Sequence, residues 1–367
     1  MYGIFRRSGK LAWIFYLTAV VIIGAGFYLL VNHNLGSNRN KDEAVHSISL
    51  FFDLCDQEKS DRERLYCLRD MATDVLDQYG LSQVMTALET RVIQKNSENP
   101  VPKCHTEAHI LGAVSGESMD NLGEVMVQCG RSCGYGCVHG AALGALRKDP
   151  GILDRAASIC LPFVASKIPG QDLTACNHGL GHGFTEIAGR DPADSFLLCD
   201  RLNSANDKQE CATGVFMELF ETSVSVDQAV IELPNDLSIF CKTIPIGYQK
   251  WCRNKAGTHE YRKTQNTGQA RKACENLEVG LVDSCFGSLG AYYHFIFNGN
   301  VVKIWEGCQA SEESETRSCL FGALGSTLVT DSSGALGRKL CSLSSGQIRT
   351  ACLKRLDDSL EQIYETP

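Results

Sequence analysis

Histidines are concentrated in one part of this chain of 367 residues. Five of its nine histidines fall between residues 105 and 182, and four of these form two pairs: His105 with His109, and His178 with His182. Residues four apart share one face of an α-helix, so each pair can present two imidazoles to one metal ion. Imidazole nitrogens bind zinc, copper and iron. The sequence therefore predicts a divalent transition-metal site, with haem b held by two histidines as the less favoured variant.

The fifth histidine, His139, belongs to the same pattern. Counted from a leading cysteine, histidines stand at +1 and +5 in "CHTEAH", at +2 in "CVHG", and at +2 and +6 in "CNHGLGH". If these segments are consecutive repeats, equivalent positions face one surface. The alternative is that all five are ordinary structural histidines near helix starts. His259 and His294 fall outside this register, and we expect them to be structural.

The expected spacing of the helices limits what one ion can reach. Packed helices lie about 8–10 Å apart, so the first and third histidine-bearing helices should be about 18 Å apart. One ion cannot span that distance unless the repeats curve tightly. His139, on the middle helix, could then complete either pair or bridge two ions.

Three carboxylates lie near the histidines in the sequence. Glu107 follows His105 by two residues, about 200° around a helix, so it should point away from a metal held by His105 and His109. This excludes the zinc-protease pattern H-E-x-x-H. Glu186 is four residues after His182 and is expected only in the outer shell of a metal. Glu218, seven residues after Cys211, should lie near the level of His182 and is the candidate catalytic acid or base.

The elements that position these residues are predicted from a cysteine repeat. Seven segments share one pattern: a cysteine, a polar stretch, a second cysteine and an apolar run. The separation of the two cysteines is 11 residues in the last four segments. The second cysteines recur with a period near 34 residues, which is typical of one helical hairpin in a solenoid. The seven pairs are Cys55/Cys67, Cys160/Cys176, Cys199/Cys211, Cys241/Cys252, Cys274/Cys285, Cys308/Cys319 and Cys341/Cys352.

We therefore predict an all-α fold, an α-solenoid of about eight to nine helical-hairpin repeats over residues 44–367. A disulfide should join the end of each second helix to the start of the next first helix, here called the lead helix. In architecture alone, this plan resembles disulfide-bridged repeat proteins of the Sel1-like and tetratricopeptide kind, and no binding residue is carried over. Nine lead helices are expected near Cys67, Cys104, Cys137, Cys176, Cys211, Cys252, Cys285, Cys319 and Cys352.

Four cysteines depart from the repeat: Cys104, Cys129, Cys133 and Cys137. The economical pairing is Cys129–Cys137 as the regular bond, with Cys104–Cys133 as an extra tie between neighbouring repeats. A four-thiolate metal site is the alternative. The oxidising compartment expected for a chain with 18 cysteines favours the disulfides.

Glycine recurs three residues after the second cysteine in "CVHG", "CNHG", "CATG" and "CLFG". Because some of these repeats contain no histidine, we interpret this glycine as a close-packing position. Gly181 and Gly183 are additional, and they could either make room for a ligand or relax the packing.

The N-terminal region contains an apolar run at residues 11–31 that is long enough to cross a membrane as a helix. Basic residues precede it, which predicts a cytoplasmic segment 1–10, a signal anchor 11–31, a linker 32–43 and an extracytoplasmic domain 44–367. A cleaved signal peptide is the alternative. The expected location is a single-pass membrane protein with its bulk in the periplasm or the extracellular space.

Composition and motifs narrow the function. The net charge of −8 argues against a nucleic-acid partner. The sequence contains no glycine-rich phosphate loop and no c-type haem motif. We therefore expect metal binding at the five histidines, with metal-dependent catalysis as an extension. The alternative is an interaction scaffold at the cell envelope that holds a peptide or protein on the inner wall of the solenoid.

Overall fold

The computed structural model describes residues 45–95, 101–118, 120–130, 133–161, 173–221, 235–331 and 333–365. The described chain is all α-helical, as predicted. Most helices alternate between a lead helix and a shorter connecting helix. The lead helices are α2 (Asp61–Tyr79), α4 (Val101–Ser118), α6 (Gly136–Lys148), α9 (Leu173–Ile187), α11 (Ala205–Phe216), the pair α13 (Ile246–Arg253) and α14 (Ala256–Thr264), α16 (Val279–Ile296), α18 (Glu313–Thr330) and α20 (Gly346–Glu365).

Connecting helices complete the hairpins, and asparagine or aspartate begins several of them. The side chains of Asn121, Asp191, Asn266 and Asn300 each accept a hydrogen bond from a backbone N–H in the first turn, which satisfies a donor that has no partner within the helix. The connecting helices are α3 (Leu81–Lys95), α5 (Leu122–Cys129), η1 (Pro150–Arg155) with α7 (Ala156–Ile159), α10 (Pro192–Cys199), α12 (Leu237–Cys241), α15 (Thr267–Glu275), α17 (Val301–Cys308) and α19 (Ala335–Ser342).

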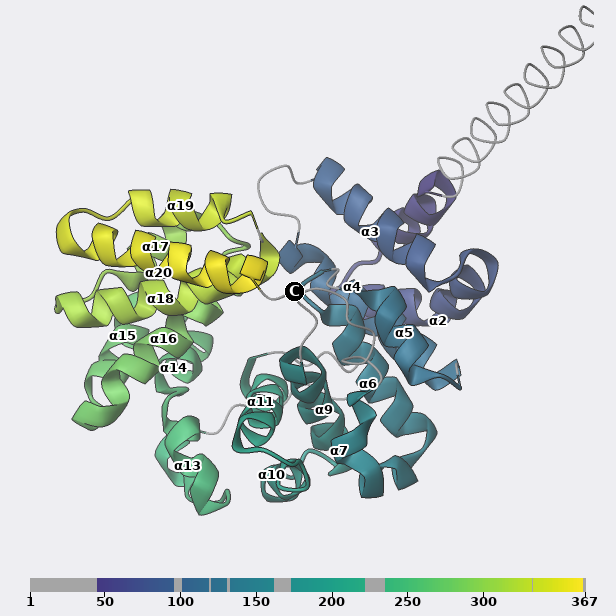
Figure 1. Ribbon diagram of the computed structural model, residues 1–367, viewed down its shortest axis with the longest axis horizontal. Helices are drawn as coiled ribbons and strands as arrows, with labels where there is room; N and C mark the ends of the chain where they lie inside the picture. Colours follow the sequence, from purple (N-terminus) through teal and green to yellow (C-terminus); the bar gives the residue numbers. More distant parts are fainter. Residues whose placement is uncertain are drawn as a thin grey trace, which may run out of the picture.

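Successive lead helices pack side by side along a curved path. Helix α6 contacts both α4 and α9, α9 contacts α11, and α18 contacts both α16 and α20. In Figure 1 the chain passes from α3 and α4 on the right, through α9 to α11 at the bottom, to α16, α18 and α20 on the left. The predicted helical repeats are therefore confirmed.

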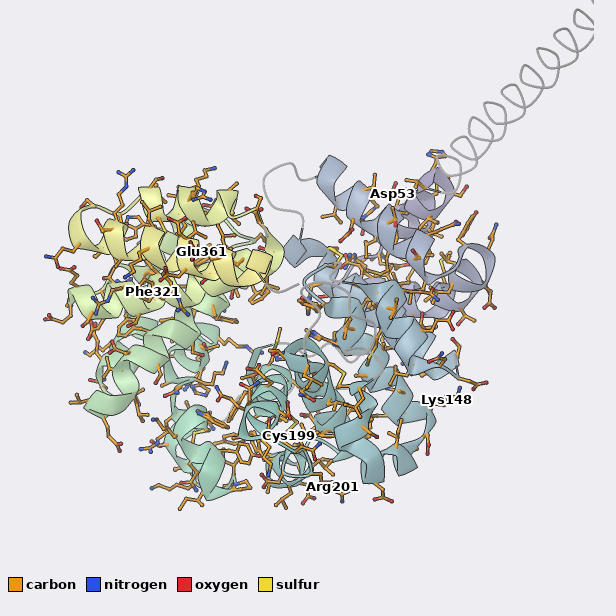
Figure 2. All side chains as sticks on the ribbon, in the orientation of Figure 1. Asp53, Lys148, Cys199, Arg201, Phe321 and Glu361 are labelled. Atoms are coloured by element: carbon orange, nitrogen blue, oxygen red, sulfur yellow. A yellow bond between two sulfur atoms is a disulfide. The ribbon has the colours of Figure 1, made fainter. Side chains whose placement is uncertain are left out.

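Disulfides tie the hairpins together in the predicted way. Nine bonds pair all 18 cysteines: the seven regular pairs, Cys129–Cys137 and Cys104–Cys133. The four-thiolate alternative is therefore wrong. Figure 2 labels Cys199, at the end of α10, whose bond to Cys211 joins that helix to α11.

The predicted membrane anchor requires a correction. In the described part of the chain, none of the helices combines the length and the apolar character needed to span a membrane. The predicted cytoplasmic segment 1–10, anchor 11–31 and linker 32–43 lie outside the described residues. We therefore do not retain the transmembrane helix or the single-pass location. The nine disulfides are typical of an oxidising compartment such as the extracellular space.

Candidate metal centre

Glycines bring the histidine-bearing helices unusually close together. A Cβ atom added to Gly140 of α6 would lie 1.9 Å from the backbone oxygen of His109 in α4, and one added to Gly112 would lie 2.0 Å from that of Cys137. Between α9 and α11, a Cβ on Gly181 or Gly214 would lie 2.0 Å from a backbone oxygen. Only glycine permits such contact between helix backbones.

The predicted packing role of the repeated glycine is therefore confirmed. A Cβ on Gly179 would lie 2.7 Å from the Cα of His139, and one on Gly183 would lie 2.4 Å from a side-chain atom of Leu146. Gly181 and Gly183 thus accommodate neighbouring helices and do not open space for a ligand.

Close packing collects the five predicted histidines from α4, α6 and α9 into one group, here called the histidine cluster (His105, His109, His139, His178 and His182). The ring centroids of His109 and His182 are 5.3 Å apart, although they belong to the first and third of these helices. The expected separation of about 18 Å concerned the helices themselves, and the imidazoles of α4 and α9 nevertheless come together. His139, on the middle helix, has its ring 4.8–6.1 Å from the other four.

Hydrogen bonds assign the proton position on three of the rings. The Nδ1–H of His105 donates to the backbone oxygen of Cys133 over 2.9 Å. The Nδ1–H of His178 donates to the hydroxyl of Thr213 over 2.8 Å, because that hydroxyl uses its own proton in a bond to Glu210 O. The Nδ1–H of His182 donates to Glu218 Oε2 over 3.0 Å. Each of these three imidazoles therefore keeps a lone pair on Nε2.

Several of the remaining ring nitrogens of the cluster lack a hydrogen-bond partner. Nε2 of His105, Nε2 of His109 and Nδ1 of His139 are buried without a hydrogen-bond partner. Leaving a buried polar atom unpaired costs about 1–3 kcal/mol. The Nε2 atoms of His178 and His182 lie 3.2 Å apart, within hydrogen-bond distance of one another. Two ligands on a tetrahedral metal ion, each about 2.0–2.1 Å from it, are separated by about 3.3 Å.

Burial favours the neutral form of four of these imidazoles, His105, His109, His139 and His178. It lowers the pKa of His105 to about 4, and burial together with neighbouring positive charge holds the pKa values of His109, His139 and His178 well below the ordinary range. A neutral imidazole is the form that binds a metal. One potential ligand atom from each of His109, His139 and His182 lies within 4.8 Å of the other two.

Glu218, predicted as a catalytic acid or base, uses both of its carboxylate oxygens in the structure. Oε2 accepts from His182, and Oε1 accepts from the guanidinium of Arg190 over 2.9 Å. Glu218 stands in a π-helical turn, η2 (Met217–Glu221), and Arg190 has a left-handed backbone with φ of 67°. Such irregular backbone is frequent at functional sites.

The other two carboxylates lie where the sequence predicted, outside the cluster. Glu107 is buried against Arg64. Glu186 forms two bonds with Arg147, at 2.5 and 2.7 Å.

Sequence reasoning missed several residues around the cluster. Arg190 and Thr213 hold Glu218 and His178, the ring of Phe295 lies 6.5 Å from that of His105, and the charge of Lys255 lowers the pKa of His178. Thr213 belongs to the repeated motif "CATG" and stands where two other repeats carry a histidine. Arg190, Phe295 and Lys255 were marked by no motif. His294, predicted to be structural, lies outside the cluster and bonds to Thr330.

Comparisons with known proteins identify no relative that explains the site. A model of the family DUF3882, described as Lactococcus phage M3 protein, matches residues 38–157. Neither the curated proteins nor the solved structures give a significant match. Nothing here supports membership of the Sel1-like or tetratricopeptide families. The DUF3882 match covers less than half of the chain and does not assign the protein to that family. The protein is a helical-repeat protein with many disulfides.

Proposed function

We propose that this protein binds transition-metal ions through the histidine cluster. The observation that carries the proposal is the set of five imidazoles from three helices, of which three are buried and two are partly buried. Ring nitrogens of His105, His109 and His139 have no hydrogen-bond partner. The 3.2 Å approach of the Nε2 atoms of His178 and His182 also supports it, because two ligand atoms of one tetrahedral ion lie about 3.3 Å apart.

The outer contacts of the cluster support the same proposal. Histidines that bind metals usually donate their second ring N–H to a carboxylate, a carbonyl or another acceptor, which fixes the tautomer and the ring orientation. His105, His178 and His182 each make such a bond, to Cys133 O, Thr213 and Glu218. We therefore assign Glu218 the role of holding His182, with Arg190 holding Glu218 in turn.

The ligand chemistry favours a bare ion over haem b. Imidazole nitrogens suit zinc, copper and iron. Within the described residues, the five rings pack against one another at centroid spacings of 4.8–6.2 Å, and a porphyrin between two of them would displace the others. A site that binds copper or iron could also support redox catalysis, which would extend this function.

The test is metal analysis of the full-length protein produced in an oxidising host, with Zn²⁺ and Cu²⁺ added back after chelator treatment. We expect tight binding in the wild type and loss of most bound metal when His178→Ala is combined with His182→Ala. Circular dichroism should show that helical content is retained. His294→Ala is the matched control, since it removes a buried histidine outside the cluster.

Failure to bind either ion by the correctly folded wild type would overturn the proposal. If the double variant also unfolded, the five histidines would be core residues. The interaction scaffold would then become the better explanation.

A further inference from the structure

The five histidines of the cluster divide into two layers by burial. His109, His139 and His182 are buried, with exposed fractions of 2, 6 and 1%, and they come one each from α4, α6 and α9. We call them the inner triad. His105 of α4 and His178 of α9 are partly exposed, and we call them the outer pair. Helices α4 and α9 thus each carry one inner and one outer histidine, four residues apart.

The inner triad has the free ligand atoms of a metal site. One potential ligand atom from each of its histidines lies within 4.8 Å of the other two. Nε2 of His109 and Nδ1 of His139 have no hydrogen-bond partner, and the bond of His182 Nδ1 to Glu218 leaves Nε2 for a metal. Ligand atoms of a tetrahedral ion lie about 3.3 Å apart, so the three rings close in around an ion. Such an ion would keep one coordination position open.

The outer pair differs from the inner triad because both of its rings are tied to groups at the edge of the cluster. The Nδ1–H of His105 donates to the backbone oxygen of Cys133, and that of His178 donates to the hydroxyl of Thr213. The lone pair of each ring is therefore on Nε2. Each outer imidazole can bind a cation through Nε2 and keep its hydrogen bond.

Both outer histidines lie against the inner triad. Nε2 of His178 is 3.2 Å from Nε2 of His182, which is close to the separation of about 3.3 Å between two ligands of one tetrahedral ion. The ring centroids of His105 and His178 are 5.3 and 4.8 Å from that of His139. The two layers are therefore close enough for one ion to exchange an outer ligand for an inner one.

Burial of the inner triad gives this exchange a purpose. Taking a cation out of water is costly unless other groups replace the lost water molecules. An imidazole of the outer pair can replace one of them while the ion is still partly hydrated. The ion then reaches the buried nitrogens with part of its coordination already supplied by the protein.

Building on the metal binding proposed above, we propose that the histidine cluster loads its ion in two steps. The outer pair takes up the ion from solution, and the inner triad then holds it. Release follows the same path in reverse. The inner triad accordingly determines the affinity for the metal, whereas the outer pair determines how fast the metal enters and leaves.

The two histidines of α9 provide a matched comparison. The side-chain amide of asparagine can donate an N–H from the place of Nδ1 in histidine. His178→Asn and His182→Asn can therefore keep the bonds to Thr213 and Glu218 while removing Nε2. Chelator-treated full-length protein is loaded with Zn²⁺, and competition with a chelator of known affinity measures the binding constant. Stopped-flow mixing measures the rates of uptake and release, and circular dichroism checks the helical content.

We expect different results for the two variants. His182→Asn removes a ligand, so the affinity should fall by more than the factor of about 10–100 that the loss of an outer-shell contact costs. His178→Asn should slow uptake and release alike, by about tenfold, and leave the affinity nearly unchanged. A residue that only passes the ion changes both rates by one factor. The control His294→Asn should change neither rate nor affinity.

The same comparison on α4, with His105→Asn as the outer variant and His109→Asn as the inner one, decides the matter if a variant of α9 does not fold. Equal losses of affinity in the outer and inner variants would show that all are ordinary ligands. That result, or unchanged rates in the outer variants, would overturn the two-step loading and leave the proposed function intact. No binding of Zn²⁺ by the wild type would overturn both.

Discussion

At the residue scale, Glu218 connects the histidine cluster to the side chains around it. Its carboxylate accepts the Nδ1–H of His182 and is itself held by Arg190. The bond fixes a tautomer that leaves Nε2 available for a metal. On the metal binding proposed above, Glu218 should influence metal affinity without being a ligand.

We expect Glu218→Gln to weaken metal binding about 10- to 100-fold while the helical content stays unchanged. The amide can still accept from His182, but the negative charge and the ion pair with Arg190 are lost. Competition with a chelator of known affinity measures the change. Glu361→Gln, an exposed position on α20, is the control. Equal affinities for Glu218→Gln and the wild type would show that Glu218 has no influence on the metal.

His294 is a buried histidine whose titration affects stability in a direction that can be worked out. Burial lowers its pKa to about 4, whereas an unfolded chain has a histidine pKa near 6.5. Between these values the unfolded state binds more protons than the native state. The free energy of unfolding therefore falls as the pH falls from about 6.5 to about 4.

His294→Gln should remove this contribution, because glutamine does not titrate. We expect the stability difference between wild type and variant to change by up to about 3 kcal/mol between pH 7 and pH 4. Urea unfolding at several pH values measures it. A difference that does not vary with pH would mean that His294 has the same pKa in both states.

At the scale of elements, the glycine crossings decide whether the cluster exists. Helices normally pack with side chains between them, but α4 and α6 make backbone contact at Gly140 and Gly112. This contact, together with the approach of Gly179 in α9 to His139 in α6, brings imidazoles from three helices within reach of one another. The cluster therefore depends on glycines, because a side chain at these positions would hold the helices further apart.

We expect Gly140→Ala to separate α4 from α6, lowering stability by about 1–3 kcal/mol or more and reducing metal binding. Gly325→Ala in α18 is the matched control, because a Cβ there meets nothing within 4 Å. Alanine should stabilise that helix by about 1 kcal/mol. Thermal unfolding and metal content test both variants. Normal metal binding by Gly140→Ala would mean that the cluster tolerates wider spacing.

The lead helices and the disulfides could be predicted because both follow a regular count of residues. The cysteine spacing of 11 residues and the period near 34 determine where each hairpin begins, and the structure places cysteine bonds at those points. The meeting of rings from the first and third histidine-bearing helices does not follow from the residue count. It depends on the close approach of neighbouring helices that Gly140 and Gly179 permit.

The hydrogen bonds behind the cluster could not be predicted in the same way. Arg190 reaches Glu218 because its backbone is left-handed and because Glu218 stands in a π-helical turn. Neither feature has a repeated residue pattern. Phe295 approaches His105 through the curvature of the repeat array, which a residue count does not encode.

At the scale of the whole molecule, the buried apolar residues of the repeats fall into three separate groups. One group of buried apolar residues extends from Ile48 to Cys252 and contains the histidine-bearing helices, a second extends from Tyr261 to Leu340, and a third joins α18 to α20. In repeat proteins each unit is stabilised mainly by its neighbours. Damage to one repeat should therefore remain local.

Two disulfides in distant parts of the array allow this to be tested. Cys341–Cys352 closes 11 residues in the last repeat, and Cys104–Cys133 closes 29 residues beside the cluster. Removing either bond should destabilise the protein by about 3–4 kcal/mol in the chain-entropy model. Their effects on metal should differ, because the backbone oxygen of Cys133 holds the ring of His105.

We expect Cys341→Ala with Cys352→Ala to loosen α19 and α20 while metal binding stays at the wild-type level. Cys104→Ala with Cys133→Ala should release His105 and lower the metal content. Hydrogen exchange locates the loosened helices, and elemental analysis measures the metal. Because both bonds contribute similar stability, a general loss of folding would affect both variants alike. Equal metal loss in the two variants would therefore show that the array unfolds as one cooperative unit. Metal binding by the cluster would then require the intact molecule and not only the repeats that carry the histidines.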